Sequence, residues 1–378
     1  SRLWQLKLTK FLTVDAGFAQ SSTDPCLFYF NAKGSIIIAA VYVDDIVVAH
    51  NGVNFNAFKD KFLSTFKAKF LGPLTWFLSV HITQSSDHTV VAHQSQYIHK
   101  LLDKFIPNYA SGSMKHTQPC DALSFPKLTT ASSDAERVKV SRLPYLQLVG
   151  SLLYLSTMTR PDIAYHMSIL CSLMHNPSLA AYAAALNLLQ YLGSTAQRQL
   201  SFKGKTRLSN FSPNVRAHIQ NNYGLHAYSD SSWHQPNELG YNMFGFIIFL
   251  FGAPIAYVAK RLKVIALSSA EAEYAAMSNA CKELTFIRQI LKDLGLLLSG
   301  PIVLFVDNQA AIQICVNSGV TARNKHFNDA IHNCRHDYVH QKILPFFVST
   351  KDQLADGFTK ALTKAIFVPW AMQIMNSV

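Results

Sequence analysis

The chain has 378 residues, of which 49% are hydrophobic and 15% are charged. This composition excludes an intrinsically disordered chain because it supplies enough apolar surface for buried cores. At ~100–200 residues per domain, the length predicts two or three domains. The 34 basic residues outnumber the 22 acidic ones, for a formal net charge of +12. That excess favours a polyanionic partner such as nucleic acid, and a generic basic protein is the alternative.

The cysteines and the apolar segments bear on location. Six cysteines at irregular spacing form no C-x-x-C pair, which argues against a zinc ribbon or a disulfide framework and indicates a reducing, intracellular compartment. The first residues carry no secretory signal and read as the middle of a longer protein. One stretch, residues 243–259, is uncharged. A membrane span is one interpretation of it, but Gly245, Gly252 and Pro254 favour a strand, a turn and a second strand.

The first 95 residues alternate helical and extended patterns. Phenylalanines recur at every third or fourth position from Phe55 to Phe66, which predicts an amphipathic helix there. The elements expected in this region are a helix ending near Gly17, strands over 35–43 and 46–49, a helix over 54–70, and strands near 77–82 and 90–93.

Residues 96–205 are expected to be mainly helical, and Pro144 and Pro161 each suit the first turn of a helix. A second region, 222–365, shows three strands, one long helix and a further strand, expected over 225–229, 244–251, 254–258, 269–294 and 302–306. This order predicts a mixed sheet and a multidomain α/β (α+β) protein. Residues 366–378 are expected to form a tail.

Two adjacent carboxylates, Asp44 and Asp45, lie between two apolar extended segments. A turn there would bring both acids to the tip of a hairpin, where their mutual repulsion favours a cation such as Mg²⁺. Mg²⁺ beside phosphates is the machinery of nucleotidyl transfer. The alternative is an Asp-Asp turn selected for turn geometry alone.

Three further acids follow or accompany predicted strands and helices. Asp230 ends one predicted strand, and Asp307 follows the apolar run Ile302–Val306. Open α/β sheets place their ligands at such strand ends. Asp356 lies near a predicted helix start, where ordinary stabilisation of a helix N-terminus is the alternative.

Glu273 and Glu271 are predicted to lie on different faces of the long helix. From Glu273 onward, apolar residues recur every three or four positions along the long helix, so Glu273 is predicted to point into the core and Glu271 to face water. A carboxylate directed inward is costly unless it is paired or bound to a metal. Glu273 is therefore the more informative acid.

His332, His336 and His340 share i, i+4 spacing on a predicted helix. This spacing suits a zinc site, but no companion acid or cysteine is evident in the sequence. The preferred interpretation is a solvated basic helix face.

Over nearly its whole length the chain resembles the copia-type (Pseudoviridae) reverse transcriptase and ribonuclease H. The segments that carry this resemblance occur in the family's order. They are Asp24-Pro-Cys-Leu-Phe28, Tyr42-Val-Asp-Asp45, Leu148-Val-Gly-Ser-Leu-Leu-Tyr-Leu155, Thr159-Arg-Pro-Asp-Ile163, Tyr228-Ser-Asp-Ser-Ser-Trp233, Glu271-Ala-Glu-Tyr274, Asp307-Asn-Gln-Ala-Ala-Ile312, Gln353-Leu-Ala-Asp356 and Phe358-Thr-Lys360.

The resemblance implies a partial reverse transcriptase palm over residues 1–95, a helical thumb or connection over 96–205 and a ribonuclease H-like domain over 222–365. It implies that Asp44 and Asp45 are polymerase acids that bind metal. It also implies a nuclease site holding two Mg²⁺ ions, with Mn²⁺ as the alternative ion. The four residues that it assigns to this site, as catalytic residues and metal ligands, are Asp230, Glu273, Asp307 and Asp356.

The implied partners are an RNA–DNA hybrid, template RNA and DNA, without a membrane. The implied location is a cytoplasmic virus-like particle, with the nucleus as an alternative. The sequence leaves the oligomeric state open.

Departures from the family pattern modify this expectation. The family's first polymerase aspartate would precede residue 1, and Ser79 stands where the family usually has Gly. Tyr241-Asn-Met-Phe244 replaces the usual Arg and Ser/Thr before Gly245, and residues 181–187 lack the family's basic residues. A decayed or divergent copy is therefore expected, with a retained ribonuclease H. The alternatives are an inactive nucleic-acid-binding remnant and a structural protein.

This 378-residue polypeptide should not extend a primer, because two polymerase acids without the third cannot hold both metal ions. The measurement is incorporation of labelled nucleotides on a primed RNA template with Mg²⁺, beside a complete reverse transcriptase as the positive control. Detectable incorporation would contradict the prediction.

Overall fold

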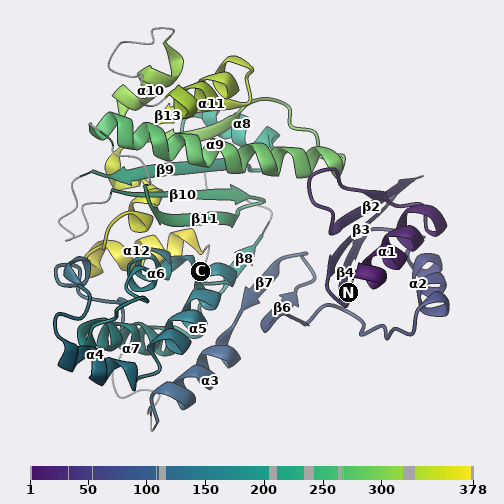
Figure 1. The fold of residues 1–378 in the computed structure, drawn as a ribbon. Coiled ribbons are helices and arrows are strands. Elements are labelled where there is room, and N and C mark those ends of the chain that lie inside the picture. Colours follow the sequence, from purple (N-terminus) through teal and green to yellow (C-terminus); the bar gives the residue numbers. More distant parts are fainter. Residues whose placement is uncertain are drawn as a thin grey trace. The chain divides into compact units, whose positions relative to one another are not determined.

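The structure is a computed structural model that divides by its contacts into two compact units. The smaller unit contains residues 1–75 and 284–299, and the larger contains 76–283 and 300–378. Figure 1 shows the elements of both. The structure describes residues 2–32, 34–52, 54–107, 109, 116–203, 211–233, 242–262, 266, 268–317 and 328–375, with backbone alone for 328–332.

The smaller unit is built on an antiparallel sheet of order β1-β2-β3-β4. Phe11 meets Phe62 and Phe66 edge to face, with ring centroids 5.7 and 5.1 Å apart, so the phenylalanine stripe forms this unit's core as predicted. The helix expected over 54–70 ends earlier, at Thr65. The elements are α1 (Arg2–Lys10), a π-helical turn (Phe11–Asp15), β1 (Ala19–Gln20), β2 (Leu27–Ala32), β3 (Ser35–Tyr42), β4 (Asp45–His50) and α2 (Asn54–Thr65).

The larger unit begins with a small antiparallel sheet of order β5-β6-β7-β8. Its strands are β5 (Trp76–Phe77), β6 (Val80–Gln84), β7 (Val90–His93) and β8 (Leu200–Phe202). The last strand was not expected from the sequence. Between β5 and β6, Leu78 and Ser79 have φ of 48° and 58°, a conformation that favours glycine. Ser79 therefore adopts a backbone conformation that glycine, the residue expected there from the family resemblance, would adopt with less strain.

Helices fill the segment between β7 and β8. They are α3 (Ser95–Phe105), α4 (Asp134–Ser141), α5 (Tyr145–Met158), α6 (Ala164–Ser172) and α7 (Leu179–Ser194). The Thr159-Arg-Pro-Asp segment lies at their centre, where the Arg160 guanidinium donates to both oxygens of Asp162 at 2.9 and 2.8 Å. The Tyr191 hydroxyl donates to the same carboxylate at 2.5 Å. Although burial opposes its charge, Arg160 lowers the pKa of Asp162. This buried pair ties α7 to the turn before α6.

A five-stranded mixed sheet of order β11-β10-β9-β12-β13 forms the rest of the larger unit. Strands β9 to β11 are antiparallel, whereas β12 is parallel to both β9 and β13. This confirms the predicted α/β class. The strands are β9 (His226–Ser232), β10 (Met243–Leu250), β11 (Ala253–Arg261), β12 (Ile302–Val306) and β13 (Ile343–Phe347), and the helices are α8 (Pro213–Asn221), α9 (Ser269–Asp293), α10 (Gln309–Val316) and α11 (Asn328–Val339).

Three of these strands bear on expectations from the sequence. The uncharged stretch at 243–259 forms β10 and β11, as preferred over a membrane span. Within the described ranges, no helix is long and apolar enough to cross a membrane. Strand β13 was missed. It contains Pro345 and lies at the sheet edge, where a residue without an N–H is tolerated.

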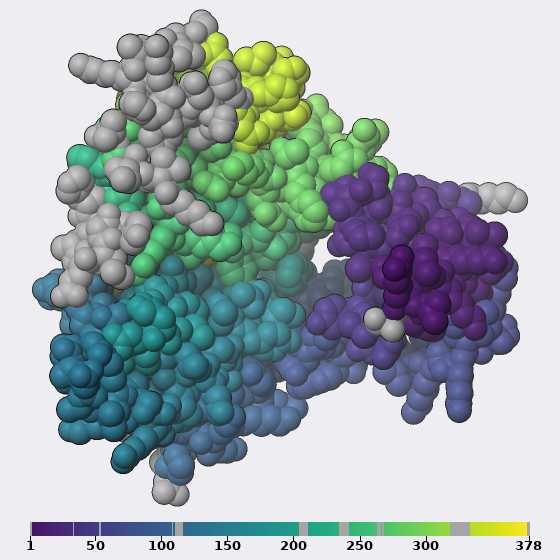
Figure 2. Space-filling view, in the orientation of Figure 1, coloured from purple at the N-terminus to yellow at the C-terminus, as the bar shows by residue number. Residues whose placement is uncertain are grey.

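The segment expected as a tail is instead a packed helix, α12 (Lys364–Ile374). Phe367 and Trp370 on it are buried, and the Trp370 indole N–H donates to the Leu354 carbonyl at 2.8 Å. The helical segment, the mixed sheet and α12 share one hydrophobic core, so they form one unit rather than separate domains. Figure 2 shows the helical segment, in blue and teal, directly against the green part of the larger unit.

Trp370→Ala should lower the free energy of unfolding of the larger unit by about 3–5 kcal/mol, because it leaves a cavity and an unpaired carbonyl. The measurement is urea unfolding followed by circular dichroism. Ile366→Ala is the matched control on the same helix, since Ile366 is 57% exposed, and its effect should stay within about 0.5 kcal/mol. Equal effects for the two variants would contradict the packing described.

Candidate functional site

The candidate site is centred on Asp230, on the middle strand β9, where the side chain is 4% exposed. Its partner across the strands is Gly245 on β10. A Cβ at Gly245 would lie 2.4 Å from the Cβ of Phe358. Glycine therefore allows the 3₁₀ turn Leu354–Phe358 to approach the sheet closely, and the hydroxyl of buried Thr359 donates to Oδ2 of Asp230.

Two further acids converge on Asp230. Glu273, 6% exposed on α9, accepts a hydrogen bond from the Ser231 N–H at 3.2 Å, and its buried Oε2 has no hydrogen-bond partner among the described residues. Asp307 directly follows β12 and accepts from the Thr350 hydroxyl at 3.0 Å. One carboxylate oxygen each from Asp230, Glu273 and Asp307 lies within 4.8 Å of the others. The prediction that Glu273 points inward is confirmed, whereas Glu271, expected to face water, is half-buried.

The fourth predicted acid, Asp356, is held differently. It lies in the 3₁₀ turn, where the Lys360 ammonium contacts its Oδ2 at 2.9 Å, while its buried Oδ1 has no hydrogen-bond partner in the part of the chain that the structure describes. It does not belong to the group of three whose oxygens meet within the described part of the chain. The structure therefore brings three of the four acids together and pairs the fourth with a lysine.

The electrostatics of this cluster disfavour negative charge. Burial, and then the charge of Asp230, raise the pKa of Glu273 to about 10 and that of Asp356 to about 7. The same two causes raise the pKa of Asp307. Acids placed this way are stabilised by a cation. Because the donors are all carboxylate oxygens, they suit a hard divalent ion such as Mg²⁺ or Mn²⁺ better than a thiophilic metal.

The residues that position the 3₁₀ turn were not predicted as site residues. Gln353 is 3% exposed; its side-chain amide donates to the Ser229 carbonyl at 3.0 Å and accepts from the Ala355 N–H at 3.1 Å. Lys360 and Thr359 also contact the acids. One signal could have revealed Lys360, namely its i, i+4 spacing from Asp356.

Asp44 and Asp45 lie at the tip of the β3–β4 hairpin, as predicted, and both are exposed. The turn holds Val43 at φ 53°, which is unfavourable for a β-branched residue. The Trp4 indole N–H donates to the Val43 carbonyl at 2.9 Å. In the described ranges no third metal-binding side chain is grouped with these two acids.

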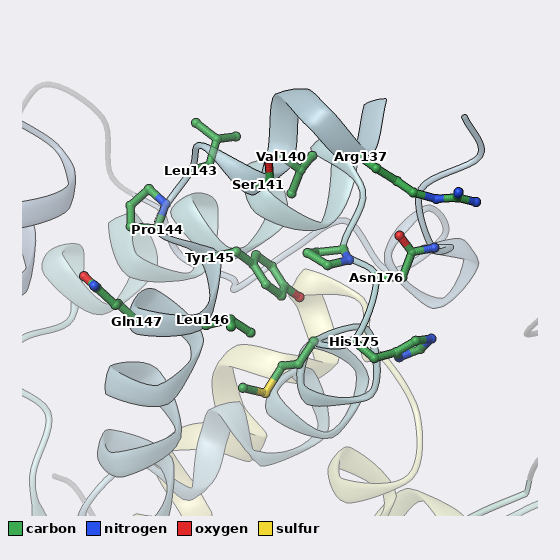
Figure 3. A pocket seen from close by; sticks show the side chains of 12 residues that line it. Arg137, Val140, Ser141, Leu143, Pro144, Tyr145, Leu146, Gln147, His175 and Asn176 are labelled. Atoms are coloured by element: carbon green, nitrogen blue, oxygen red, sulfur yellow. The ribbon is translucent and has the colours of Figure 1, made fainter. Parts of the chain in front are cut away.

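Two other features do not form a comparable site. The His340 ring contacts the His336 ring at 4.0 Å and the His336 carbonyl at 2.8 Å, and the side chain of His332 lies outside the described residues. A pocket of about 620 Å³ lies among α4, α5 and the α6–α7 connection, lined by Arg137, Tyr145 and His175 among others (Figure 3). It includes none of the candidate acids.

Comparisons with known proteins place the chain in a family. A reverse transcriptase (RNA-dependent DNA polymerase) family model matches residues 1–117. The chain is 30% identical over 374 residues to the retrovirus-related Pol polyprotein from transposon RE1 of Arabidopsis thaliana, and 31% over 380 residues to that from transposon RE2. Each match covers 99% of this chain and 24% of the relative. The corresponding polyprotein of transposon TNT 1-94 from Nicotiana tabacum is 26% identical, over 97% of this chain and 26% of its own length.

The chain thus spans about a quarter of the length of these relatives. Among solved structures, a ribonuclease H1 from the archaeon Halobacterium salinarum is 18% identical, with a TM-score of 0.27, over 36% of this chain and 93% of that one. Similarity to the plant polyproteins extends over nearly all of this sequence. The chain therefore belongs to the Pol polyproteins of copia-type retrotransposons, and its residues 1–117 belong to their reverse transcriptase region.

Proposed function

We propose that the larger unit is a metal-dependent ribonuclease that hydrolyses the RNA strand of an RNA–DNA hybrid. The observation that supports this most directly is the meeting of buried Asp230, buried Glu273 and half-buried Asp307 within 4.8 Å. Three like charges from β9, α9 and β12 are not needed to stabilise the fold, because burial and mutual repulsion both oppose them. A bound divalent cation explains why they are placed together.

In the proposed mechanism, Asp230, Glu273, Asp307 and Asp356 would hold two Mg²⁺ ions, with Mn²⁺ as an alternative. Such ions, when bound, polarise the phosphate and activate water. The chain supplies rigid placement: the Ser231 N–H orients Glu273, and the Thr350 hydroxyl orients Asp307. The Thr359 hydroxyl donates to Asp230, so each of the three acids is held by a hydrogen bond that limits its freedom to turn away from the others.

The family and the net charge of the chain support a proposal for its substrate. We propose an RNA–DNA hybrid as the substrate, with template RNA and DNA as partners, since a net charge of +12 favours polyanions. We also propose that residues 1–378 alone do not polymerise DNA, because Asp44 and Asp45 have no third acid grouped with them among the described residues. The cellular compartment stays a prediction.

One observation favours a second candidate, a remnant that binds hybrids without cleaving them. Asp356 stands outside the group of three acids and is paired with Lys360 at 2.9 Å. If that ion pair persists when metal is present, only three ligand side chains remain. Binding would then survive without turnover, because phosphate contacts do not depend on the acids.

Asp230→Asn and Glu273→Gln should each reduce cleavage of a labelled RNA–DNA hybrid by more than about a hundredfold, the scale of single catalytic groups. The assay uses Mg²⁺ and follows RNA fragments on a denaturing gel. Glu271→Gln is the matched control on the same helix and should keep wild-type activity. Binding without cleavage by the wild-type chain would favour the remnant, and neither binding nor cleavage would favour a structural role.

The acids should also make stability depend on pH and metal. Because the folded-state pKa of Glu273 is raised from 4.5 to about 10, the folded chain binds more protons than the unfolded chain between these values. Without metal, stability should therefore fall as pH rises from about 5 to about 9. Thermal unfolding in a chelator and in Mn²⁺ measures this. Mn²⁺ should raise the melting temperature most at high pH.

Glu273→Gln provides the control for this pH dependence, because it removes the raised carboxyl while keeping its shape. In the chelator, the variant should lose stability less steeply with pH than the wild type, and Mn²⁺ should stabilise it less. Identical pH profiles for the two proteins, with and without Mn²⁺, would rule out a metal centre at this position.

A further inference from the structure

Three of the six cysteines converge from three different helices. Cys281 lies on α9, Cys315 on α10 and Cys334 on α11, and each is fully buried at 0% exposure. The sulfurs of Cys281 and Cys334 are 3.2 Å apart. The third thiol, Cys315, donates to the backbone carbonyl of Cys334 at 3.7 Å. The irregular sequence spacing argued against a zinc ribbon and a disulfide framework, and it gave no indication that these three cysteines meet.

The surroundings of the three thiols are polar as well as buried. Tyr274 lies two turns before Cys281 on the same face of α9 and forms a hydrogen bond with Cys315. Hydrogen bonding with Cys334 lowers the pKa of Cys315 despite burial. Burial raises the pKa of Cys334. The cluster therefore combines two sulfurs 3.2 Å apart with a third buried thiol beside them.

We propose that Cys281 and Cys334 are a redox-active pair that forms a disulfide on exposure to a peroxide. One thiol attacks the peroxide O–O bond, giving a sulfenic acid and one water. The second thiol then displaces hydroxide from that sulfur, forming the S–S bond and a second water. Two thiols are oxidised, hydrogen peroxide is reduced to two waters, and the two thiol protons are taken up in those waters.

The geometry requires only a small rearrangement. A disulfide has sulfurs about 2.05 Å apart, so the pair would approach by roughly 1 Å. The bond would join α9 to α11 across 53 residues, and the closed segment contains β12 and Asp307. Because the bond shrinks the unfolded ensemble, it should stabilise the half of the sheet that carries Asp307.

The burial of the two sulfurs determines how fast the pair would be oxidised. With both sulfurs fully buried, a peroxide reaches them only when α11 opens locally. Oxidation should therefore be slow in native buffer and faster in urea concentrations below the unfolding transition. Reduction by a dithiol should show the same dependence, so the bond persists once formed.

The test is peroxide treatment of the whole 378-residue chain, followed by alkylation and peptide mapping by mass spectrometry without reductant. The expected result is a cross-linked peptide joining Cys281 to Cys334, formed faster in mild urea. The melting temperature should rise by several degrees and return to its starting value after reduction with a dithiol. A predominant link between other cysteines, or free thiols at both positions even in mild urea, would overturn the proposal.

Variants separate this pair from the remaining thiols. Cys281→Ser and Cys334→Ser should each abolish the cross-link and the peroxide-dependent rise in melting temperature. Cys315→Ser and Cys171→Ser, matched controls inside and outside the cluster, should retain both. If a serine variant fails to fold, Cys281→Ala provides the same comparison. Persistence of the temperature rise in a folded Cys281 variant, or its loss in Cys315→Ser, would contradict the assignment.

Discussion

Mutual repulsion among buried carboxylates is the constraint on which the site depends. Asp230, Glu273 and Asp307 would separate if their side chains were free, since burial makes each charge costly and each charge disfavours the next. They stay together because β9 and β12 are paired by backbone hydrogen bonds and share an apolar core, while α9 carries Glu273 on its buried face. The fold thus maintains an arrangement that the side chains alone would oppose. A bound cation would make the electrostatic energy of the three carboxylates favourable instead of unfavourable.

The support for this arrangement comes from the far end of the chain. Trp370 on α12 holds the Leu354 carbonyl, and Gln353 ties the same turn to β9. Gly357 makes room for this packing, since a Cβ there would lie 2.2 Å from the Trp370 ring. A segment without any catalytic side chain therefore determines where Asp356, Thr359 and Lys360 lie relative to Asp230.

The helical segment contributes in a comparable way. Its Arg160–Asp162 pair is buried and fully hydrogen-bonded, so it specifies how α7 meets the turn before α6, whatever its net effect on stability. Phe367 of α12 contacts both His166 and Tyr191 of this segment. The helices thus support α12, and α12 in turn supports the turn that carries Asp356. These contacts explain why the hydrophobic core is continuous across the boundary expected between residues 96–205 and 222–365.

Local patterns in the sequence were enough to determine the strands β9 to β12, the inward phase of Glu273, the position of Asp307 after a buried strand and the Asp44-Asp45 turn. Each of these depends on the periodicity of a single helix or strand, or on the residue types of one turn. Only the tertiary structure decided that Thr359 contacts Asp230, that β13 pairs beside β12, that α12 is packed and that three cysteines meet. Those outcomes depend on contacts between residues far apart in the chain. The periodicity of a single helix or strand shows which of its faces is buried, but it does not show which distant segment packs against that face.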